Sequence, residues 1–305
     1  MDLFEKKSIE PMLIAEEKQP FDSDDYIYEL KIDGIRCIAY CDKDVGITEL
    51  KNKRGLSLNS RYPELTDLHK YVKARKCILD GELYVFNNGR PDFFKVQRRA
   101  TLKNPFKIKR AMASNPAVYT AFDILYKDGQ NLEKQTLMER KRVLKETIRE
   151  NERFSYSRYI ENDGIALFEL TKEKNLEGIV AKHKQSMYFQ GKRSKNWIKC
   201  KHMMEDDFII LGYRFLEDGM TSLLLGKYDE ETNNFIEIST VSLGVSYSKL
   251  RKYLTKCDYE SKGYFRVEPS VVCTVKFMGY TEEGNMRQPS FKIVRDDKAV
   301  KDCTI

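Results

Sequence analysis

The stretch Glu29-Leu30-Lys31-Ile32-Asp33-Gly34-Ile35-Arg36 lies where an alternating strand pattern meets a turn. Upstream, Tyr26, Tyr28 and Leu30 alternate with other residues, which predicts a β-strand. The Asp33-Gly34 pair favours a tight turn. A lysine at the end of such a strand can project into a cleft, although a surface charge is the ordinary role of any single lysine. Lys31 is therefore a candidate nucleophile whose assignment depends on the rest of the sequence.

Nucleophilic attack by a lysine requires the neutral amine. With an ordinary pKa of about 10.4, roughly one lysine in a few thousand is neutral at pH 7. Neighbouring cations or burial lower that pKa. The same cations would also bind a triphosphate, so the positions of other basic residues bear on the assignment of Lys31.

Further segments place polar or aromatic groups within apolar strand patterns. Residues 79–83 carry Glu82, and residues 121–126 carry Phe122. A carboxylate in such a strand either faces solvent or lines a site, and a phenyl ring either packs in the core or stacks on a purine. Glu177 and Lys182 stand at the two ends of a short strand pattern at residues 177–182.

Residues 193–201 form an extended basic segment. Lys199 and Lys201 would point to the same face of a strand, so both ammonium groups could reach one phosphate chain. Trp197, the single tryptophan of the protein, shares that face.

The order of predicted elements indicates an α+β protein with two domains. Strand patterns at residues 77–86 and 118–126 mix with helical spacing at 65–72, 134–151 and 165–174. After His202 the pattern changes to short strands with one helix, which is the inventory of an oligonucleotide-binding (OB) barrel. The strands are expected at 208–215, 222–228, 235–242 and 271–280, and the helix at 247–256. We expect domains at residues 1–203 and 204–305.

Composition sets broad limits on function. The chain has 305 residues, of which 41% are hydrophobic and 33% charged, as expected of a soluble globular protein. Its formal net charge is +7. Residues 90–110 concentrate eight basic residues and three phenylalanines against one acid, Asp92. Such a stretch can bind a phosphate backbone or be a solvated surface loop, and its composition alone does not decide. If it binds DNA, charge reversal at Arg98 and Arg99 is expected to weaken binding of a nick in a salt-dependent manner.

Other residue patterns argue against several classes of protein. The charged amino terminus lacks the apolar segment of a signal peptide, and apolar runs are too short to cross a bilayer, so a cytoplasmic protein without a membrane partner is expected. Seven cysteines without a Cys-x-x-Cys pair, and three histidines, argue against a zinc site or a disulfide scaffold.

In this order and spacing, the segments together resemble the covalent nucleotidyltransferases, which include DNA ligases, RNA ligases and mRNA capping enzymes. Lys31, Asp33, Gly34 and Arg36 match the pattern Lys-x-Asp-Gly-x-Arg. Residues 52–55, with residues 62–65 after them, look like the second element of the family. The strands at 79–83, 121–126 and 177–182 and the segment 193–201 then follow in family order. The resemblance spans roughly residues 10–300.

The carboxy-terminal part narrows the resemblance to ATP-dependent DNA ligases. Residues 277–291 run into Val294-Arg295-Asp296-Asp297-Lys298, which looks like the last strand and the terminal Arg-x-Asp-Lys motif of those enzymes. Residues 122–142 also look more like a DNA ligase than a capping enzyme. No helical DNA-binding domain is expected before the catalytic core, so the chain resembles the minimal two-domain enzymes of phages, viruses and bacteria. The resemblance implies an adenylation domain of antiparallel sheets with helices, followed by an OB-fold domain.

The resemblance also implies a role for each site residue. Lys31 would attack the α-phosphate of ATP and carry AMP as a phosphoramidate. Glu29 would recognise adenine, and Phe122 would stack on it. Arg36, Arg54 and Glu82 would contact the ribose and the rest of the nucleotide. Arg193, Lys199 and Lys201 would contact the phosphates. Arg295 and Lys298 would contact the ATP tail in a closed form of the protein. A divalent cation, expected to be Mg²⁺, would have Glu177 and Glu82 as acidic partners.

The implied substrate is nicked double-stranded DNA with a 3′-hydroxyl and a 5′-phosphate, as met in replication, repair or recombination. A monomer is expected, and the sequence leaves open whether a clamp or end-binding protein assists it. An RNA ligase or a capping-type guanylyltransferase is the nearest alternative. A non-catalytic single-strand-binding protein built on the OB domain is a further one, but it leaves the ordered motifs before His202 unexplained.

Overall fold

The computed structural model describes residues 2–217, 219–280 and 284–305. The chain folds as two compact units, Met1–Lys201 and His202–Ile305. Residues 281–283, which belong to the stretch that resembles the last ligase strand, lie outside the described residues.

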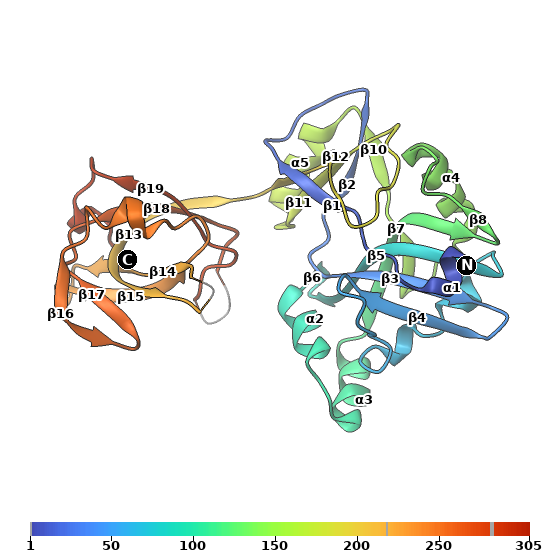
Figure 1. The fold of residues 1–305 in the computed structure, drawn as a ribbon, viewed down its shortest axis with the longest axis horizontal. Coiled ribbons are helices and arrows are strands. Elements are labelled where there is room, and N and C mark those ends of the chain that lie inside the picture. The colour runs from blue at the N-terminus through green and yellow to red at the C-terminus, as the bar shows by residue number, and fades with distance from the viewer. Residues whose placement is uncertain (1, 218, 281–283) are drawn as a thin grey trace. The chain divides into compact units, whose positions relative to one another are not determined.

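The first unit is built on two sheets in its described part (Figure 1). One sheet has the order β1-β12-β11-β2-β10, and the other has the order β4-β3-β5-β7-β8, with β6 paired to β5 and β9 paired to β7. The strands are β1 (Leu13–Glu17), β2 (Tyr26–Leu30), β3 (Ile35–Asp42), β4 (Ile47–Asn52), β5 (Lys76–Asn87), β6 (Arg90–Pro91), β7 (Ala117–Lys127), β8 (Gln130–Asn131), β9 (Phe154–Tyr156), β10 (Tyr159–Glu161), β11 (Gly178–His183) and β12 (Arg193–Lys201).

Both faces of the first sheet are covered. On its outer face, Tyr28 and Ile179 pack with Phe168 of α5 (Gly164–Glu173), which lies against β11 and β2 in Figure 1. On its inner face, Val180 and Trp197 join a second apolar cluster. This double coverage explains why successive residues of β2 are buried although its sequence alternates.

The second sheet supplies the other side of that cluster, with Ile38, Ile78 and Leu125. Its opposite face forms the largest core of the unit, in which Leu79 and Tyr119 pack beneath helices and turns. The helices of the unit are α1 (Leu3–Lys6), α2 (Phe93–Ala100), α3 (Pro105–Ser114), α4 (Leu137–Thr147) and α5. The apolar cluster between the sheets holds them together and leaves a pocket beside it.

One helix expected in this unit does not form. Leu65, Leu68 and Val72 have helical spacing, yet the chain makes two short 3-10 turns, η1 (Pro63–Leu65) and η2 (Leu68–Tyr71), and then becomes extended at Val72. All three side chains are buried. The apolar spacing therefore predicted correctly that these side chains are buried, but the prediction of a helix was wrong because two 3-10 turns bury them instead.

The second unit is a β-barrel. Its described strands pair in the cycle β13-β14-β15-β19-β18-β13, which a backbone bridge between Leu243 and Ser290 closes. The hairpin β16-β17 joins the later half of β13. The elements are β13 (Met204–Phe215), β14 (Thr221–Asp229), β15 (Asn234–Val241), α6 (Tyr247–Leu250), β16 (Lys256–Ser261), β17 (Tyr264–Val267), β18 (Val272–Phe277), β19 (Ser290–Arg295) and η3 (Val300–Asp302).

This arrangement is a five-stranded OB-type barrel, so the α+β fold expected from the sequence is confirmed. The helix expected at residues 247–256 is shorter than predicted, because α6 ends at Leu250 and Lys256 already pairs with Val267. In the part of the chain that the structure describes, no helix is long and apolar enough to cross a membrane.

Candidate active site

A pocket of about 530 Å³, open to solvent on one side, lies beside the apolar cluster of the first unit. Five residues predicted from the sequence line it, namely Glu29, Lys31, Arg36, Glu82 and Phe122. The other lining residues are Ile14, Leu30, Ile32, Ser157, Val180, Lys182 and Trp197.

Strand register explains how the first sheet contributes to this pocket. Val180 of β11 lies opposite Glu29 of β2 on one side and Lys199 of β12 on the other. Lys182, two residues along β11, lies opposite Trp197. Because directly opposed residues share a face and residues two apart repeat it, these side chains all project toward the second sheet.

Lys31 follows β2 at the edge of the pocket. Its backbone N–H donates to Gly178 O at 2.9 Å, and its Nζ lies 2.6 Å from Glu177 Oε2. The Lys31 side chain is 23% exposed, whereas that of Glu177 is 3% exposed. The turn that follows requires Gly34, because a Cβ there would lie 2.5 Å from Leu83 O. The amine thus lies in the open part of the pocket beside a buried carboxylate.

Arg36 enters from the second sheet, where it lies opposite Glu82. Its guanidinium makes two hydrogen bonds to Asp80, at 2.7 and 2.6 Å, and lies 4.8 Å from the centre of the Phe122 ring. A paired contact of this kind fixes the plane of a guanidinium. Asp80 therefore orients Arg36 against Phe122.

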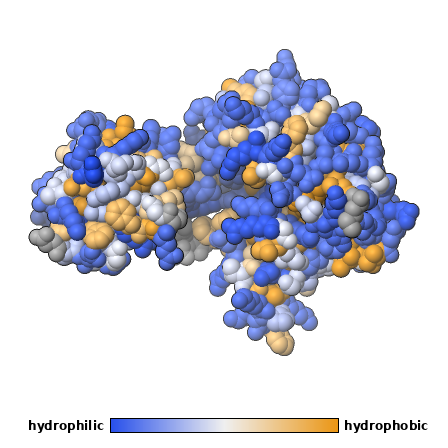
Figure 2. Space-filling view, viewed as in Figure 1, coloured by the Kyte–Doolittle hydropathy of each residue, from blue (hydrophilic) through white to orange (hydrophobic). Residues whose placement is uncertain are grey.

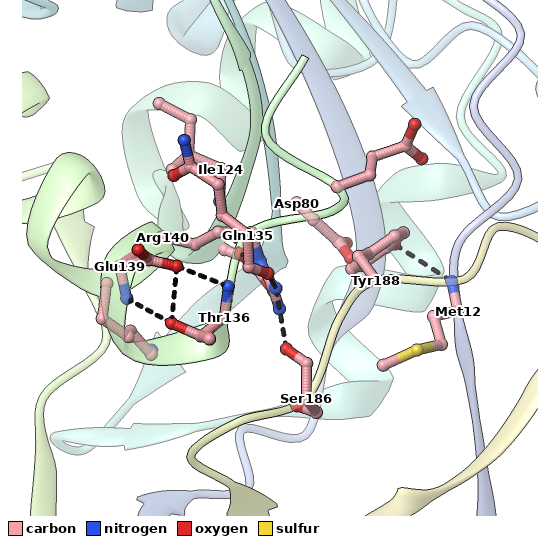
Figure 3. A network of polar contacts seen from close by, with 12 residues as sticks. Met12, Asp80, Ile124, Gln135, Thr136, Glu139, Arg140, Ser186 and Tyr188 are labelled. Carbon is pink, nitrogen blue, oxygen red and sulfur yellow. Dashed lines mark hydrogen bonds and ion pairs between the residues drawn. The ribbon is translucent and has the colours of Figure 1, made fainter.

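A polar network behind the pocket holds Asp80 in turn. Tyr188 donates its hydroxyl to Asp80 at 2.6 Å and accepts from the Met12 N–H at 3.0 Å, as Figure 3 shows. The same view shows Arg140 of α4 reaching Ser186, whose carbonyl it contacts at 2.9 Å. The segment around Tyr188 is thus attached to both α4 and the second sheet.

Burial shifts the pKa of both acids near Lys31. The pKa of Glu82 is raised to about 8 by burial, and Lys31 and Arg36 oppose this only in part. Burial also raises the pKa of Glu177, against the effect of Lys31. Glu177 is among the charges that raise the pKa of Glu82, so the two carboxyl groups are close enough to interact.

We predict that Glu82→Gln stabilises the ligand-free protein at alkaline pH. A carboxyl whose folded pKa of about 8 exceeds its unfolded value of 4.5 favours folding below the lower value, and this contribution is lost as pH rises through the higher one. The melting temperature of the variant relative to the natural protein should therefore be higher at about pH 8.5 than at about pH 5.5. Each kcal/mol corresponds to about 2–4 °C in domains of this size.

The matched control for this experiment is Glu169→Gln, on the exposed face of α5. It should leave the melting temperature close to that of the natural protein at both pH values. If Glu82→Gln gives the same difference at both pH values, the raised pKa is wrong.

The remaining predicted residues of the first unit do not line this pocket. Arg193 Nη1 donates to Ile14 O at 3.2 Å. Lys199 and Lys201 contact the same oxygen of Glu17, at 3.0 and 3.6 Å, so they share a face as the sequence predicted. The exposed Arg54 lies in the turn after β4, where its backbone N–H donates to Asn52.

Arg295 and Lys298 belong to the second unit, where both contact Asp207. Arg295 Nη1 and Lys298 Nζ lie 3.1 and 3.0 Å from Asp207 Oδ2. Thr274 donates to the other oxygen of that carboxylate at 2.5 Å. Asp207 thus holds two cations side by side on the barrel.

The sequence places Lys182 at the end of a strand pattern but assigns it no role in the site. It is buried, its Nζ lies 3.2 Å from Glu29 Oε2, and it lies 4.4 and 4.2 Å from the Phe122 and Trp197 ring centres. Burial lowers its pKa to about 8, although Glu29 opposes the shift. The available signal was a lysine within an otherwise apolar strand, β11, directly after the acid Glu177.

Comparison with known proteins decides the family. The ATP dependent DNA ligase domain matches residues 10–201, and the ATP dependent DNA ligase C terminal region matches residues 217–298. The chain belongs to the ATP-dependent DNA ligase family. Its activity is therefore that of a ligase, as the motifs around Lys31 predicted.

Two relatives resemble this ligase over nearly its whole length. The SPbeta prophage-derived DNA ligase-like protein LigB of Bacillus subtilis (strain 168) is 33% identical over 285 residues, which are 93% of this chain and 98% of that protein. The multifunctional non-homologous end joining DNA repair protein LigD of Mycobacterium tuberculosis (strain H37Rv) is 27% identical over 317 residues. That match covers 97% of this chain but 40% of LigD, so the ligase spans less than half of that relative.

Solved structures agree with the fold. A mycobacterial DNA ligase D complexed with ATP and MES aligns over 98% of both chains with a TM-score of 0.57 and 25% identity. A Lig E DNA ligase, described as binding DNA with a minimal scaffold, aligns over 94% of this chain and all of the other (100%) with a TM-score of 0.63. At 22% identity the latter supports the fold alone.

Proposed function

We propose that the pocket binds ATP and that this ligase seals nicks in duplex DNA through a covalent Lys31–AMP intermediate. The observation that carries the proposal is the position of Lys31. Its amine lies at the pocket, 2.6 Å from a buried carboxylate of Glu177, while Phe122 and Glu29 line the same pocket. A flat ring, an acceptor and a nucleophile around one cavity suit an adenine nucleotide.

In the first step, Lys31 Nζ attacks the α-phosphorus of ATP. A nitrogen–phosphorus bond forms, the bond to the bridging oxygen breaks, and pyrophosphate leaves. The amine must also lose a proton, and Glu177 is the acidic group in contact with it. In the next steps the AMP moves to the 5′-phosphate at the nick, and the 3′-hydroxyl then displaces AMP to form the phosphodiester bond.

Cations around the pocket would neutralise the phosphates. Phosphoryl transfer depends mainly on positioning and on charge stabilisation, so a lysine- and arginine-rich site fits the chemistry. Arg36 is oriented by Asp80 and would contact the nucleotide together with Glu82. We assign ribose and phosphate contacts also to Arg54, Arg193, Lys199 and Lys201, which lie outside the pocket lining in the ligand-free chain.

Glu82 and Glu177 are proposed to hold a divalent cation. In the described residues no group of three His, Cys, Asp or Glu side chains is placed to hold a metal. Two nearby carboxyl groups with raised pKa values nevertheless fit an Mg²⁺ ion that takes its other ligands from phosphate and water. Such an ion would stabilise negative charge on the phosphates.

Arg295 and Lys298 are proposed to bind the ATP tail during the first step. Asp207 groups the two side chains into one charged patch on the barrel, in which Asp297 also accepts two hydrogen bonds of 2.7 Å from the Arg295 guanidinium. Domain closure that brings such a patch to the pyrophosphate, followed by opening, would let the same barrel contact DNA later. We also propose, from the sequence, that the protein is a monomer and acts in the cytoplasm.

The basic stretch at residues 90–110 is proposed to contact the DNA backbone. It forms α2 and α3, which lie together at one edge of the first unit in Figure 1, and Figure 2 shows a largely hydrophilic surface over α3. Its exposed cations are Arg90, Arg98, Lys103, Lys107, Lys109 and Arg110.

Arg99 does not belong to that surface, which corrects an expectation from the sequence. Its guanidinium contacts both oxygens of Glu64, at 2.5 and 3.2 Å, and the two side chains are 4% and 1% exposed. Glu64 also accepts from the Ala117 N–H at 3.0 Å. Arg99 is thus a structural residue that ties α2 to η1 and β7.

Charge reversal at neighbouring positions should separate the two roles. Arg98→Glu should weaken binding of nicked duplex and reduce the salt dependence of log Kd by about one unit, because a phosphate contact releases about one counterion. Arg99→Glu should instead lower the free energy of unfolding by about 3–5 kcal/mol, because it leaves Glu64 buried without its cation. Fluorescence anisotropy across a salt series and urea unfolding measure the two effects. Equal DNA affinity for Arg98→Glu and the natural protein would contradict the proposed surface.

The nearest alternative is an RNA ligase or a capping-type guanylyltransferase. It is tested by incubating the protein with α-labelled ATP or GTP, or with labelled NAD, and then adding nicked DNA or nicked RNA. Our proposal expects label from ATP alone and sealing of DNA. Label from GTP, or sealing of RNA alone, would favour the alternative.

A further inference from the structure

Helix α4 places two consecutive cations behind the pocket. Arg140 contacts Asp123 with two hydrogen bonds of 2.8 and 2.9 Å, and neither side chain is exposed. Lys141 Nζ lies 2.5 Å from Glu29 Oε1, with side chains 3% and 2% exposed. Lys141 itself does not line the pocket, whereas Glu29 does. Lys141 therefore reaches the pocket only through Glu29.

Several hydrogen bonds hold the first turn of α4, so Lys141 projects from a rigid element. Thr136 and Glu139 form a capping box, which Figure 3 shows beside Arg140. Arg140 adds hydrogen bonds to the Gln135 and Ser186 carbonyls at 2.7 and 2.9 Å. A helix held at its first turn by these contacts positions the next side chain precisely enough to orient a partner.

The Glu29 carboxylate is shared between two buried ammonium groups. Lys141 faces Oε1, and Lys182 lies 3.2 Å from Oε2. Two ammonium groups, from α4 and β11, thus fix the plane of one carboxylate on β2. Removal of Lys141 would leave Glu29 paired with Lys182 and free to turn about that contact.

Glu29 Oε1 retains hydrogen-bonding capacity. Lys141 Nζ lies 2.5 Å from this oxygen, and a carboxylate oxygen has two lone pairs, so it can accept a second hydrogen bond beside the lysine. Glu29 lines the pocket, so a donor on a bound ligand would take that second position.

We propose that Lys141 is a positioning residue for base selection, which holds the Glu29 carboxylate so that it accepts from the 6-amino group of adenine. The inference rests on the proposed binding of ATP in this pocket. An ionised carboxylate only accepts hydrogen bonds, so it matches an amino group at position 6 and repels the carbonyl oxygen of a 6-oxo purine. A site built around one hydrogen bond rejects the wrong group strongly, because mispairing leaves buried polar atoms unsatisfied.

The test compares Lys141→Met with Lys141→Arg and with Lys145→Met, which removes an exposed lysine one turn further along α4. Self-adenylation is measured with ATP and with inosine triphosphate, which carries an oxygen at position 6. Lys141→Met should raise KM for ATP about tenfold or more, with a smaller change in kcat, and should lower the ATP preference by a similar factor. Lys141→Arg should retain most of the preference, and Lys145→Met all of it.

Two further measurements separate positioning from a general structural defect. Sealing of a pre-adenylated nick should change much less than self-adenylation in Lys141→Met, because its adenine is already attached to the DNA and no free nucleotide has to be selected. In a Glu29→Gln background, Lys141→Met should have no additional effect on base preference, because its effect passes through the carboxylate. Lys141→Gln replaces Lys141→Met in both comparisons if the latter does not fold.

An unchanged preference for ATP in a folded Lys141 variant, or an additive effect in the Glu29→Gln background, would overturn the inference. Failure of the underlying proposal gives a different result, because the natural protein would then take no label from ATP at all.

Discussion

Replacement of Lys31 by alanine is expected to abolish covalent uptake of AMP. The lysine supplies the only atom that becomes bonded to the α-phosphorus in the proposed first step, so no neighbouring side chain can replace it. Glu177, its contact in the ligand-free chain, is an acid that can take a proton but cannot form the phosphoramidate. Incubation with α-labelled ATP, followed by denaturing electrophoresis, should show a labelled band for the natural protein and none for the variant.

The variant should remain folded. Loss of the ammonium leaves the buried Glu177 carboxyl without its cation, which should lower the free energy of unfolding by about 1–3 kcal/mol and no more. Lys43→Ala, an exposed position between β3 and β4, is a matched control that should label normally. A Lys31→Ala protein that still carries label would assign the nucleophile elsewhere.

Replacement of Lys298 by alanine is expected to impair the first step selectively. If Lys298 binds the ATP tail, its loss removes a charge-assisted contact of about 1.5–3 kcal/mol, or roughly 10–150-fold in the rate of self-adenylation at low ATP. Sealing of a nick that already carries AMP needs no triphosphate, so its rate should change far less.

The two steps can be measured separately on the same preparations, by label transfer to protein and by sealing of a pre-adenylated nick. Lys301→Ala, an exposed lysine of η3 in the same unit, serves as the control and should affect neither step. Equal losses in both steps for Lys298→Ala would argue against a role of the barrel in binding the ATP tail.

The pocket was accessible to sequence reasoning because its residues come from strands in a fixed order. Glu29 lies within one alternating strand and Lys31 follows it, and Glu82 and Phe122 interrupt apolar runs, so each residue stood out against its local pattern. Adjacent strands of a sheet then bring such residues together, as the opposition of Arg36 and Glu82 shows.

Partners distant in sequence escaped that reasoning. Glu29 pairs with Lys141 and Arg99 pairs with Glu64, and no periodicity links residues so far apart. Arg99 is an example of the error that results, because its basic neighbours in the sequence suggested a DNA contact, whereas tertiary packing buries its side chain. Asp207, which groups two cations on the barrel, was likewise invisible as a single acid in a strand.

The secondary structure also differs from the prediction where apolar side chains can be buried by more than one local conformation. Residues 65–72 satisfy their apolar spacing with 3-10 turns, and β1 (Leu13–Glu17) forms before the first strand that the sequence predicted. β1 is short and ends in two acids, but it pairs in parallel with β12 and so gains its stability from the sheet. Tertiary contacts therefore decided both elements.

The most direct test of the account follows one labelled phosphate through the whole reaction. The protein is incubated with α-labelled ATP, separated from free nucleotide, and mixed with duplex DNA that carries a single nick. We expect the label first on the protein, then briefly on the 5′-phosphate of the nick, and finally in free AMP as the strand becomes continuous. A protein that takes no label, or a labelled protein that cannot pass it to the nick, would contradict the account.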